Sequence, residues 1–251
     1  MHTVELNCDL GESFGRYKLG LDEKVIPLIS SANVACGFHA GDPQVMRKTI
    51  ALAKEAGVAV GAHPGYPDLQ GFGRRDMRLN PDEVYATVLY QIGALHAFCQ
   101  AQGVSLHHVK PHGQLYNHAA IDKPQAEAIA AAVHDFNPQL ALIALANGNL
   151  VEAGQSQGLR VAQEFFMDRN YTDEGVLVPR SLDNAVITDE DFAIKRAIDV
   201  IKEGKLESEH GKIIEIQADT ICVHGDNVKA LEFVRDLRRA FKTAGIDIKA
   251  F

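Results

Sequence analysis

The stretch VSLHHVKPHGQLYNH, residues 104–118, passes from an apolar run directly into a cluster of polar side chains. Its first part, 104–110, has the length and the β-branched content of a buried strand. Its second part begins with Lys110 and His112, two side chains that can carry or transfer a proton. In parallel α/β folds, ligands bind where strands end at their carboxyl side. The stretch therefore predicts a strand whose end contributes polar groups to a pocket.

Six further apolar runs have the same length, and longer segments with helical periodicity separate them. These runs cover 4–9, 32–36, 58–62, 140–146, 159–165 and 220–224. Their nearly continuous apolar character is typical of strands that are covered on both faces. Strands that alternate with helices predict an α/β protein with a parallel sheet. Because no Gly-, Ser- or Pro-rich linker interrupts residues 1–251, we expect a single domain.

Helix start signals stand before most of the helical segments. Asp42-Pro43 and Asn80-Pro81 each place a capping side chain before a proline at the first helical position. We expect helices from Pro43 to Gly57, from Pro81 to Gly103, over 122–136, from Thr188 to near Gly204, and after Asp226 as the cap of the last one. Residues 166–187 lack clear periodicity, and long loops of this kind are often functional.

Composition excludes several classes of protein. The formal net charge is −8, which disfavours nucleic-acid binding, because phosphate recognition needs clustered Lys and Arg. No apolar run approaches the ~20 residues that span a membrane, and the first residues do not have the pattern of a signal peptide. The four cysteines have no CxxC spacing. We therefore expect a reduced, cytoplasmic protein.

The predicted strands share one property, which is that their carboxyl ends carry chemically active side chains. A single polar residue in such a place usually caps a helix, but caps do not account for all seven ends together. We therefore predict one active site from these ends. Its candidate residues are Asp9, Glu12, His39, His63, Lys110, His112, Asn147, Glu164, Asp168, Arg169, His224 and Asp226, joined by Arg180 after the long loop.

These residue types support acid–base chemistry on an anionic substrate. The carboxylates can activate water as general bases, the histidines can move protons or bind a metal ion, and Lys110 with the arginines can hold an anion. The sequence contains no GxSxG nucleophile elbow, no Walker A pattern and no GxGxxG after a strand. A serine hydrolase, a P-loop nucleotide site and a dinucleotide cofactor are thus disfavoured.

A metal site is the main alternative. One Asp with two His would suit a hydrolytic zinc ion. The histidines, however, follow different strands, and Pro111 argues against a helical pair of His108 and His112. We therefore assign no metal ligand from the sequence and keep a metal-dependent hydrolase as an alternative.

Five motifs carry a resemblance to a known family. They are LNCDLGES (6–13), NVACGFHAGDP (33–43), GAHPGYPDLQGFGRR (61–75), VKPHGQLYN (109–117) and VHGDN (223–227). Together they resemble the LamB/YcsF family, whose characterised members are the A component of bacterial 5-oxoprolinase. The resemblance extends over essentially the whole chain. It implies an irregular seven-stranded parallel β/α barrel, similar to glycoside hydrolase and deacetylase barrels.

The same resemblance implies a reaction and its participants. The expected reaction is ATP-dependent opening of the lactam of 5-oxo-L-proline to give L-glutamate. Subunits B and C are the expected partners, and ATP with Mg²⁺ is the expected cofactor, which a partner subunit could bind. Carried over by motif, the expected site residues are Asp9, Glu12, His39, His63, Lys110, His112 and the end formed by His224 and Asp226.

The expected roles follow from the chemistry of lactam opening. Asp9 or Glu12 would direct water, Lys110 would neutralise negative charge, and His63 or His112 would protonate the leaving ring nitrogen. Substrate binding is expected from His39, Asn147, Glu164, Asp168, Arg169, Arg180, His224 and Asp226. Two alternatives remain open. One is a stand-alone metal-dependent amide or acyl-sugar hydrolase, and the other is a non-catalytic subunit that delivers substrate to its partners.

Overall fold

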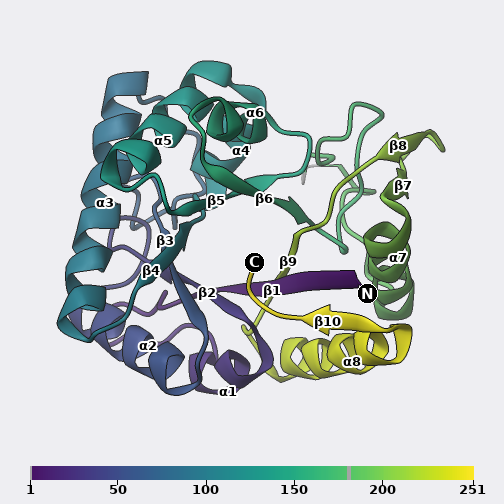
Figure 1. Ribbon diagram of the computed structural model, residues 1–251, viewed down its shortest axis with the longest axis horizontal. Coiled ribbons are helices and arrows are strands. Elements are labelled where there is room, and N and C mark those ends of the chain that lie inside the picture. The colour runs from purple at the N-terminus through teal and green to yellow at the C-terminus, as the bar shows by residue number, and fades with distance from the viewer. Residues whose placement is uncertain (1, 180–181) are drawn as a thin grey trace.

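The computed structural model describes residues 2–179 and 182–251. Within these residues, seven parallel strands close into a barrel (Figure 1). The strands are β1 (His2–Leu10), β2 (Ser31–Ala35), β3 (Ala59–His63), β4 (Leu106–Val109), β5 (Ala141–Leu145), β6 (Arg160–Phe165) and β9 (Thr220–Val223). Each strand pairs with the next, and β1 pairs with β9, where Leu6 lies opposite Ile221. The predicted seven-stranded α/β barrel is confirmed.

The strands are buried because both of their faces are covered. Every residue of β2, β5 and β9 is buried. One face of each strand packs toward the interior of the barrel, and the other packs against the surrounding helices. This double coverage explains why the strands appear in the sequence as continuous apolar runs rather than as alternating ones.

Helices form the outer layer. Those predicted from start signals are α2 (Pro43–Glu55), α3 (Pro81–Ala101), α5 (Lys123–Phe136), α7 (Glu190–Glu203) and α8 (Val228–Ala244). In Figure 1, α2, α3 and α5 lie on one side of the strands, and α7 and α8 lie on the other. Asn80 forms a complete capping box with Glu83, and Asp42 caps α2 by accepting two backbone N–H groups.

The cap of the last helix differs from the prediction. Asn227, not Asp226, is the N-cap of α8, and its side chain accepts a hydrogen bond from the N–H of Ala230. Both residue types make good caps, so the choice depends on where the backbone leaves the strand, which composition does not reveal. Asp226 is thereby released from the role of a cap.

Several short elements have no clear signal in the sequence. They are α1 (Asp22–Val25), η1 (Ile26–Leu28), α4 (Gly113–Ile121), α6 (Asn149–Ser156), β7 (Lys205–Glu207), β8 (Ile213–Glu215) and β10 (Ile246–Ile248). Strand β10 pairs with the first three residues of β1, which lengthens β1 beyond the predicted run 4–9. Strands β7 and β8 form a separate antiparallel hairpin.

The long segment after β6 is held by local contacts. Isolated bridges pair Arg169 with Val186 and Tyr171 with Leu177.

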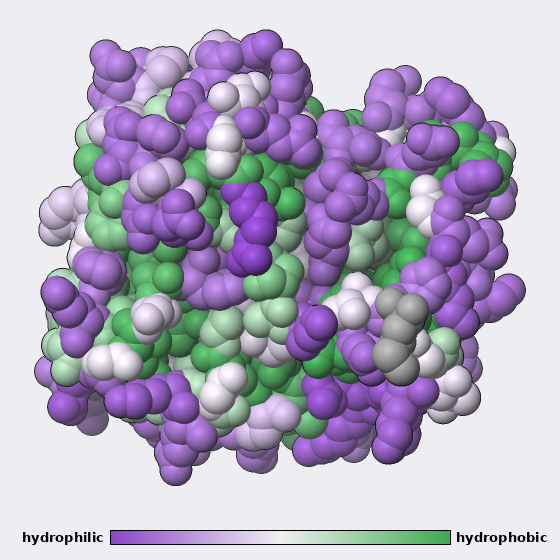
Figure 2. Space-filling model, in the orientation of Figure 1, coloured by the Kyte–Doolittle hydropathy of each residue, from purple (hydrophilic) through white to green (hydrophobic). Residues whose placement is uncertain are grey.

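In Figure 2, polar and charged residues cover much of the face that is shown, and hydrophobic residues are visible in the hollows between them. No helix within the described ranges is both long enough and apolar enough to cross a membrane.

Candidate active site

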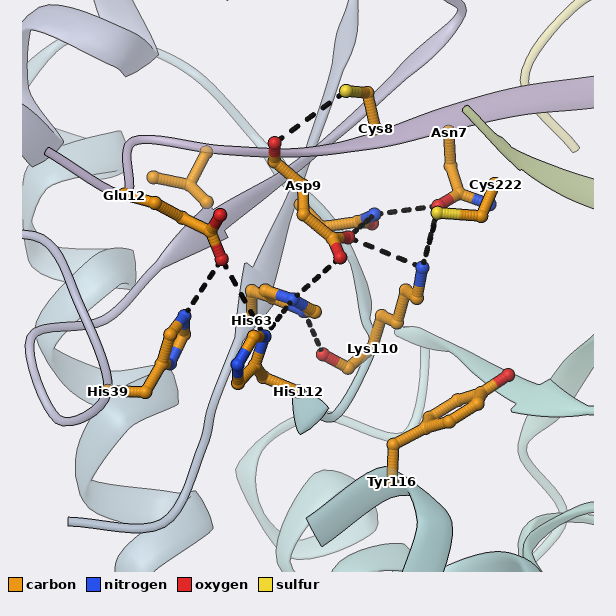
Figure 3. Close-up of polar contacts among 12 residues, drawn as sticks. Asn7, Cys8, Asp9, Glu12, His39, His63, Lys110, His112, Tyr116 and Cys222 are labelled. Atoms are coloured by element: carbon orange, nitrogen blue, oxygen red, sulfur yellow. Dashed lines mark hydrogen bonds and ion pairs between the residues drawn. The ribbon is translucent and has the colours of Figure 1, made fainter. Parts of the chain in front are cut away.

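A cavity of about 520 Å³ opens at the carboxyl ends of the barrel strands. The ends of several strands contribute to it, together with helix α4 and the segment after β6. Among its lining residues are Asp9, His63, Lys110, His112, Tyr116, Arg169, Val178, Cys222 and His224. Many of the predicted strand-end residues thus meet at one place, and Figure 3 shows how the central ones face each other.

Lys110 lies at the floor of the cavity and is almost completely buried. Its Nζ lies 2.8 Å from Glu164 Oε1 and 3.3 Å from Asp9 Oδ1, and it donates to Asn7 Oδ1 at 3.0 Å. Burial alone would lower the pKa of Lys110, but the negative charges of Asp9 and Glu164 outweigh it, so the pKa is raised well above its usual value. Lys110 is therefore a fixed positive charge.

Glu164 and its partners hold this charge from below. The carboxylate is fully buried and accepts hydrogen bonds from Asn7 Nδ2 at 2.8 Å and from the Tyr116 hydroxyl at 2.6 Å. A buried ion pair is stable only when its remaining hydrogen-bonding positions are filled, and here they are. Glu164 thus supports the floor of the cavity rather than lining it.

Asp9 stands between the lysine and the histidines. Its Oδ1 accepts a hydrogen bond from Asn33 Nδ2 at 2.8 Å, and its Oδ2 lies 3.2 Å from His63 Nε2. Burial would raise the pKa of Asp9, but the interactions with His63 and Lys110 dominate and hold it well below its usual value. Asp9 is therefore a carboxylate that can accept a proton or orient a water molecule.

The orientations of His63 and His112 are fixed by backbone carbonyls. His63 Nδ1 donates to the carbonyl of Lys110 at 2.7 Å, and His112 Nε2 donates to the carbonyl of Phe72 at 2.8 Å. A carbonyl only accepts hydrogen bonds, so these two nitrogens carry the protons in the neutral rings. The other nitrogens, His63 Nε2 and His112 Nδ1, face each other at 3.0 Å.

Glu12 and His39 complete this group. Glu12 Oε1 lies 3.2 Å from His39 Nε2 and 3.6 Å from His112 Nδ1. Burial and the charge of Asp9 raise the pKa of Glu12 well above its usual value. Burial also lowers the pKa of His39 and brings the pKa of His112 to about 3, so both rings are neutral. Ligand atoms of Glu12, His39, His63 and His112 all lie within 4.8 Å of one another.

A glycine makes this crowding possible. Gly73 has a φ of +65°, and a Cβ atom there would lie 2.8 Å from His39 Cβ and 2.9 Å from His112 Cδ2. The carbonyl of the preceding residue, Phe72, which itself has a φ of 56°, is the one that orients His112. The GFGRR motif therefore shapes the backbone against which the histidines pack.

The remaining predicted residues lie in different surroundings. His224 is exposed and lines the cavity, whereas Asp226 lies at a small neighbouring hollow beside Glu12. Asn147 is exposed, and its amide donates to the carbonyl of Glu215. Asp168 is half-buried and is not among the residues that line the cavity.

Of the two predicted arginines in the long segment, the structure describes one. Arg169 lines the cavity, but its guanidinium donates to the carbonyls of Ala185 and Val178. Arg180 lies outside the described residues. Arg169 therefore stabilises the segment after β6 as well as bordering the site.

Four contributors to the site were not among the predicted site residues. Asn7 and Tyr116 bind the charged groups of the floor, while Cys222 and Arg74 line the cavity. All four fall in or beside strand-end motifs, so their position in the sequence was a usable signal. The sequence did not show that each of these four side chains points toward the site.

Comparison with known proteins identifies relatives along the whole chain. The LamB/YcsF family matches residues 4–251. The A component of the 5-oxoprolinase of Clostridium beijerinckii is 58% identical over 248 residues, which is 99% of this chain and 97% of the relative. That of Bacillus subtilis is 52% identical over 250 residues, with 100% and 97% covered. The crystal structure of a lactam utilization protein from Thermus thermophilus superposes with a TM-score of 0.93 at 50% identity, covering 99% of this chain and 100% of that one.

Proposed function

The chain belongs to the LamB/YcsF family, and we propose that it is the A component of a 5-oxoprolinase. This enzyme opens the lactam ring of 5-oxo-L-proline to give L-glutamate and hydrolyses ATP. Relatives that carry this name match over the full length of the chain, which supports the proposal. The structural observation that carries it is the contact of Asp9 with both Lys110 and His63 at one side of the cavity.

This contact supplies the groups that lactam opening requires. A five-membered lactam is a stable amide, and phosphorylation of its oxygen turns that oxygen into a leaving group. One water molecule then opens the ring by breaking the C–N bond, and a second releases the phosphate, so ATP and two waters yield glutamate, ADP and phosphate. Asp9 directs the attacking water, and the ammonium of Lys110 neutralises charge on the oxygen or the phosphate. Asp9, whose Oδ2 lies 3.2 Å from His63 Nε2, takes a proton from the attacking water and passes it to the ring nitrogen as that nitrogen leaves.

Arg74 is the side chain that we propose for the substrate carboxylate. It is exposed, lines the cavity, and its guanidinium lies 5.1 Å from the centre of the Phe72 ring. A guanidinium can bind a carboxylate through two parallel hydrogen bonds. Arg169 borders the same cavity and is the second cation near the substrate.

The ATP site is proposed for the assembled enzyme and not for a particular component of it. The sequence of this chain has no P-loop pattern. We propose subunits B and C as the partners, and Mg²⁺ as the ion that accompanies the nucleotide. The phosphorylated lactam would then reach Asp9 and Lys110 through the open side of the cavity.

The test is glutamate release from 5-oxo-L-proline and ATP, measured with this chain by itself and with subunits B and C added. We expect activity only in the full mixture, and we expect Asp9→Asn to abolish it while the circular dichroism spectrum and the assembly stay unchanged. Asp199→Asn is the matched control, because it makes the same change at an exposed position of α7.

Other outcomes would contradict this proposal in distinct ways. Turnover by this chain by itself and without ATP would identify a stand-alone hydrolase. Full activity of the Asp9→Asn complex, with only its substrate affinity changed, would identify a protein that delivers substrate without taking part in the reaction.

A further inference from the structure

We propose that Glu12, His39, His63 and His112 form a binding site for one divalent transition-metal ion of the zinc class. Their ligand atoms lie within 4.8 Å of one another, and the three histidines are buried. The inference goes beyond the proposed function, because it concerns this chain by itself and holds whatever substrate the cavity takes.

The contact between His63 and His112 is the first argument. The outer nitrogen of each ring donates to a backbone carbonyl, at 2.7 Å for His63 and 2.8 Å for His112. The two inner nitrogens are 3.0 Å apart, and in neutral rings neither of them carries a proton. Two lone pairs at this distance repel each other unless a proton or a metal cation lies between them, so the geometry provides a place for a cation. Histidines that bind metals are commonly oriented in this way, with the second ring nitrogen donating to a carbonyl or a carboxylate.

The distances are the second argument. In a tetrahedral zinc site with bonds of about 2.0–2.1 Å, two ligand atoms are separated by about 3.3 Å. Here His63 Nε2 and His112 Nδ1 are 3.0 Å apart, and Glu12 Oε1 lies 3.2 Å from His39 Nε2 and 3.6 Å from His112 Nδ1. These three separations are close to that value, and Figure 3 shows Glu12 above the rings of His39 and His112.

His39 and the packing around it are the third argument. The ring of His39 is fully buried and stacks on that of His112 with centroids 3.6 Å apart. His39 Nδ1 has no hydrogen-bond partner among the described residues, so it can carry the single proton of the neutral ring while Nε2 faces Glu12. Nε2 is then free to bind a cation together with Glu12.

The ligand types indicate the kind of ion. Imidazole nitrogens with one carboxylate oxygen suit Zn²⁺, Fe²⁺, Co²⁺ or Ni²⁺ better than Mg²⁺ or Ca²⁺, which prefer oxygen. Asp9 Oδ2 lies 3.2 Å from His63 Nε2, on the side that lines the cavity. An ion at this place supplies a positive charge next to Asp9, which can polarise a carbonyl or acidify a water molecule.

The experiment measures metal binding to the isolated chain, without ATP, substrate or partners. The protein is stripped with a chelator and then titrated with Zn²⁺ by calorimetry and with Co²⁺ by visible absorption. We expect one equivalent of Zn²⁺ to bind and to raise the unfolding temperature, and we expect Co²⁺ to show the strong absorption of a four- or five-coordinate ion. Glu12→Gln and His112→Gln should each weaken binding by about 100-fold, since losing even a partner of a ligand typically costs 10–100-fold.

His134→Gln is the matched control, because His134 is partly exposed on α5 and lies outside the cluster. It should leave the affinity unchanged. The proposal is wrong if the stripped wild type binds neither ion at micromolar concentrations, a result that does not depend on how the variants fold. It is also wrong if folded Glu12→Gln and His112→Gln bind as the wild type does. Because no step uses 5-oxoproline, a failure of the proposed function would not affect these readings.

Discussion

At the scale of single residues, the buried pair of Lys110 and Glu164 determines how the floor of the cavity is held. Both side chains are nearly inaccessible, and their charged atoms are 2.8 Å apart. Removing one partner of such a pair leaves a buried charge without compensation, which typically costs about 3–5 kcal/mol.

We therefore expect Glu164→Gln to lower the free energy of unfolding by about 3 kcal/mol in urea titrations. Glu152→Gln is the control, because Glu152 forms an exposed pair with Lys123 at 3.5 Å, and its loss should change stability by less than about 0.5 kcal/mol. Equal effects of the two variants would mean that the buried pair contributes no more than a surface pair.

The sequence predicted which residues gather at the strand ends, but not how they pair. Asp9 and His63 lie at the carboxyl ends of strands, and Lys110 and His112 come directly after one, so their arrival at one cavity followed from the parallel sheet. The partner of Lys110 did not, because Glu164 lies on β6, two strands from β4, and the sequence does not show which side chains of separate strands meet inside the barrel. Asn147 also lies at a strand end, but it does not line the cavity. Its backbone is left-handed (φ 64°), and its side-chain amide donates to the carbonyl of Glu215. The roles assigned to these residues stay predictions.

At the scale of elements, the ring of His108 in β4 can pack against β3 because Gly61 has no side chain. Gly61 lies in β3, where the register with β4 shifts, and a Cβ there would overlap the ring of His108. His108 in turn contacts Asn33 Oδ1 at 2.8 Å, and Asn33 donates to Asp9. The space at Gly61 therefore lets His108 hold Asn33, and Asn33 in turn orients Asp9, the candidate general base.

We expect Gly61→Ala to destabilise the fold by about 1–3 kcal/mol, because a methyl group has no room there. Gly93→Ala should do the reverse, raising stability by up to about 1 kcal/mol, because Gly93 lies inside helix α3 and has no atom within 4 Å of its would-be Cβ. Thermal unfolding of the two variants checks both signs. A neutral Gly61→Ala would show that His108 can move aside freely.

Elements were predicted well where their pattern was long and poorly where it was short. All seven barrel strands were found from apolar runs, but β7, β8 and β10 have three residues each and show no periodicity. Helix α4 was missed because polar residues on one of its sides, such as Gln114 and Asn117, line the cavity. Its pattern is therefore not that of a helix with one apolar and one solvated face.

At the scale of the whole molecule, a buried carboxyl group lies where the first and last barrel strands meet. Glu5 of β1 is almost inaccessible, accepts a hydrogen bond from the Thr220 hydroxyl of β9, and has Ser31, the Phe251 backbone and Glu164 as its other close neighbours. Burial raises the pKa of Glu5 from 4.5 to about 7. The folded protein therefore keeps this proton at pH values where the unfolded chain releases it.

The direction of the pH effect follows from that difference. Glu5 contributes its full stability below pH 4.5, and the contribution is lost as the pH rises to about 7. We expect the wild type to lose on the order of 2–3 kcal/mol relative to Glu5→Gln between about pH 5 and about pH 8.5, since one pKa unit corresponds to about 1.4 kcal/mol. Urea titrations of both proteins at the two pH values measure this. A difference that stays constant with pH would contradict the raised pKa.

The pairing of β1 with β9 also has a consequence for synthesis. Thr220 and Glu5, which form a hydrogen bond across this seam, are 215 positions apart in the chain. Strand β1 therefore leaves the ribosome long before β9 exists. The edge of β1 that pairs with β9 stays open until β9 has been made. Asn7 and Asp9 of β1 are made early, whereas Cys222 and His224, which line the same cavity as Asp9, are made late. Each newly made molecule gains its complete cavity only after β9 has been synthesised, so a chain that stops soon after β6 would have unpaired strand edges and an incomplete cavity.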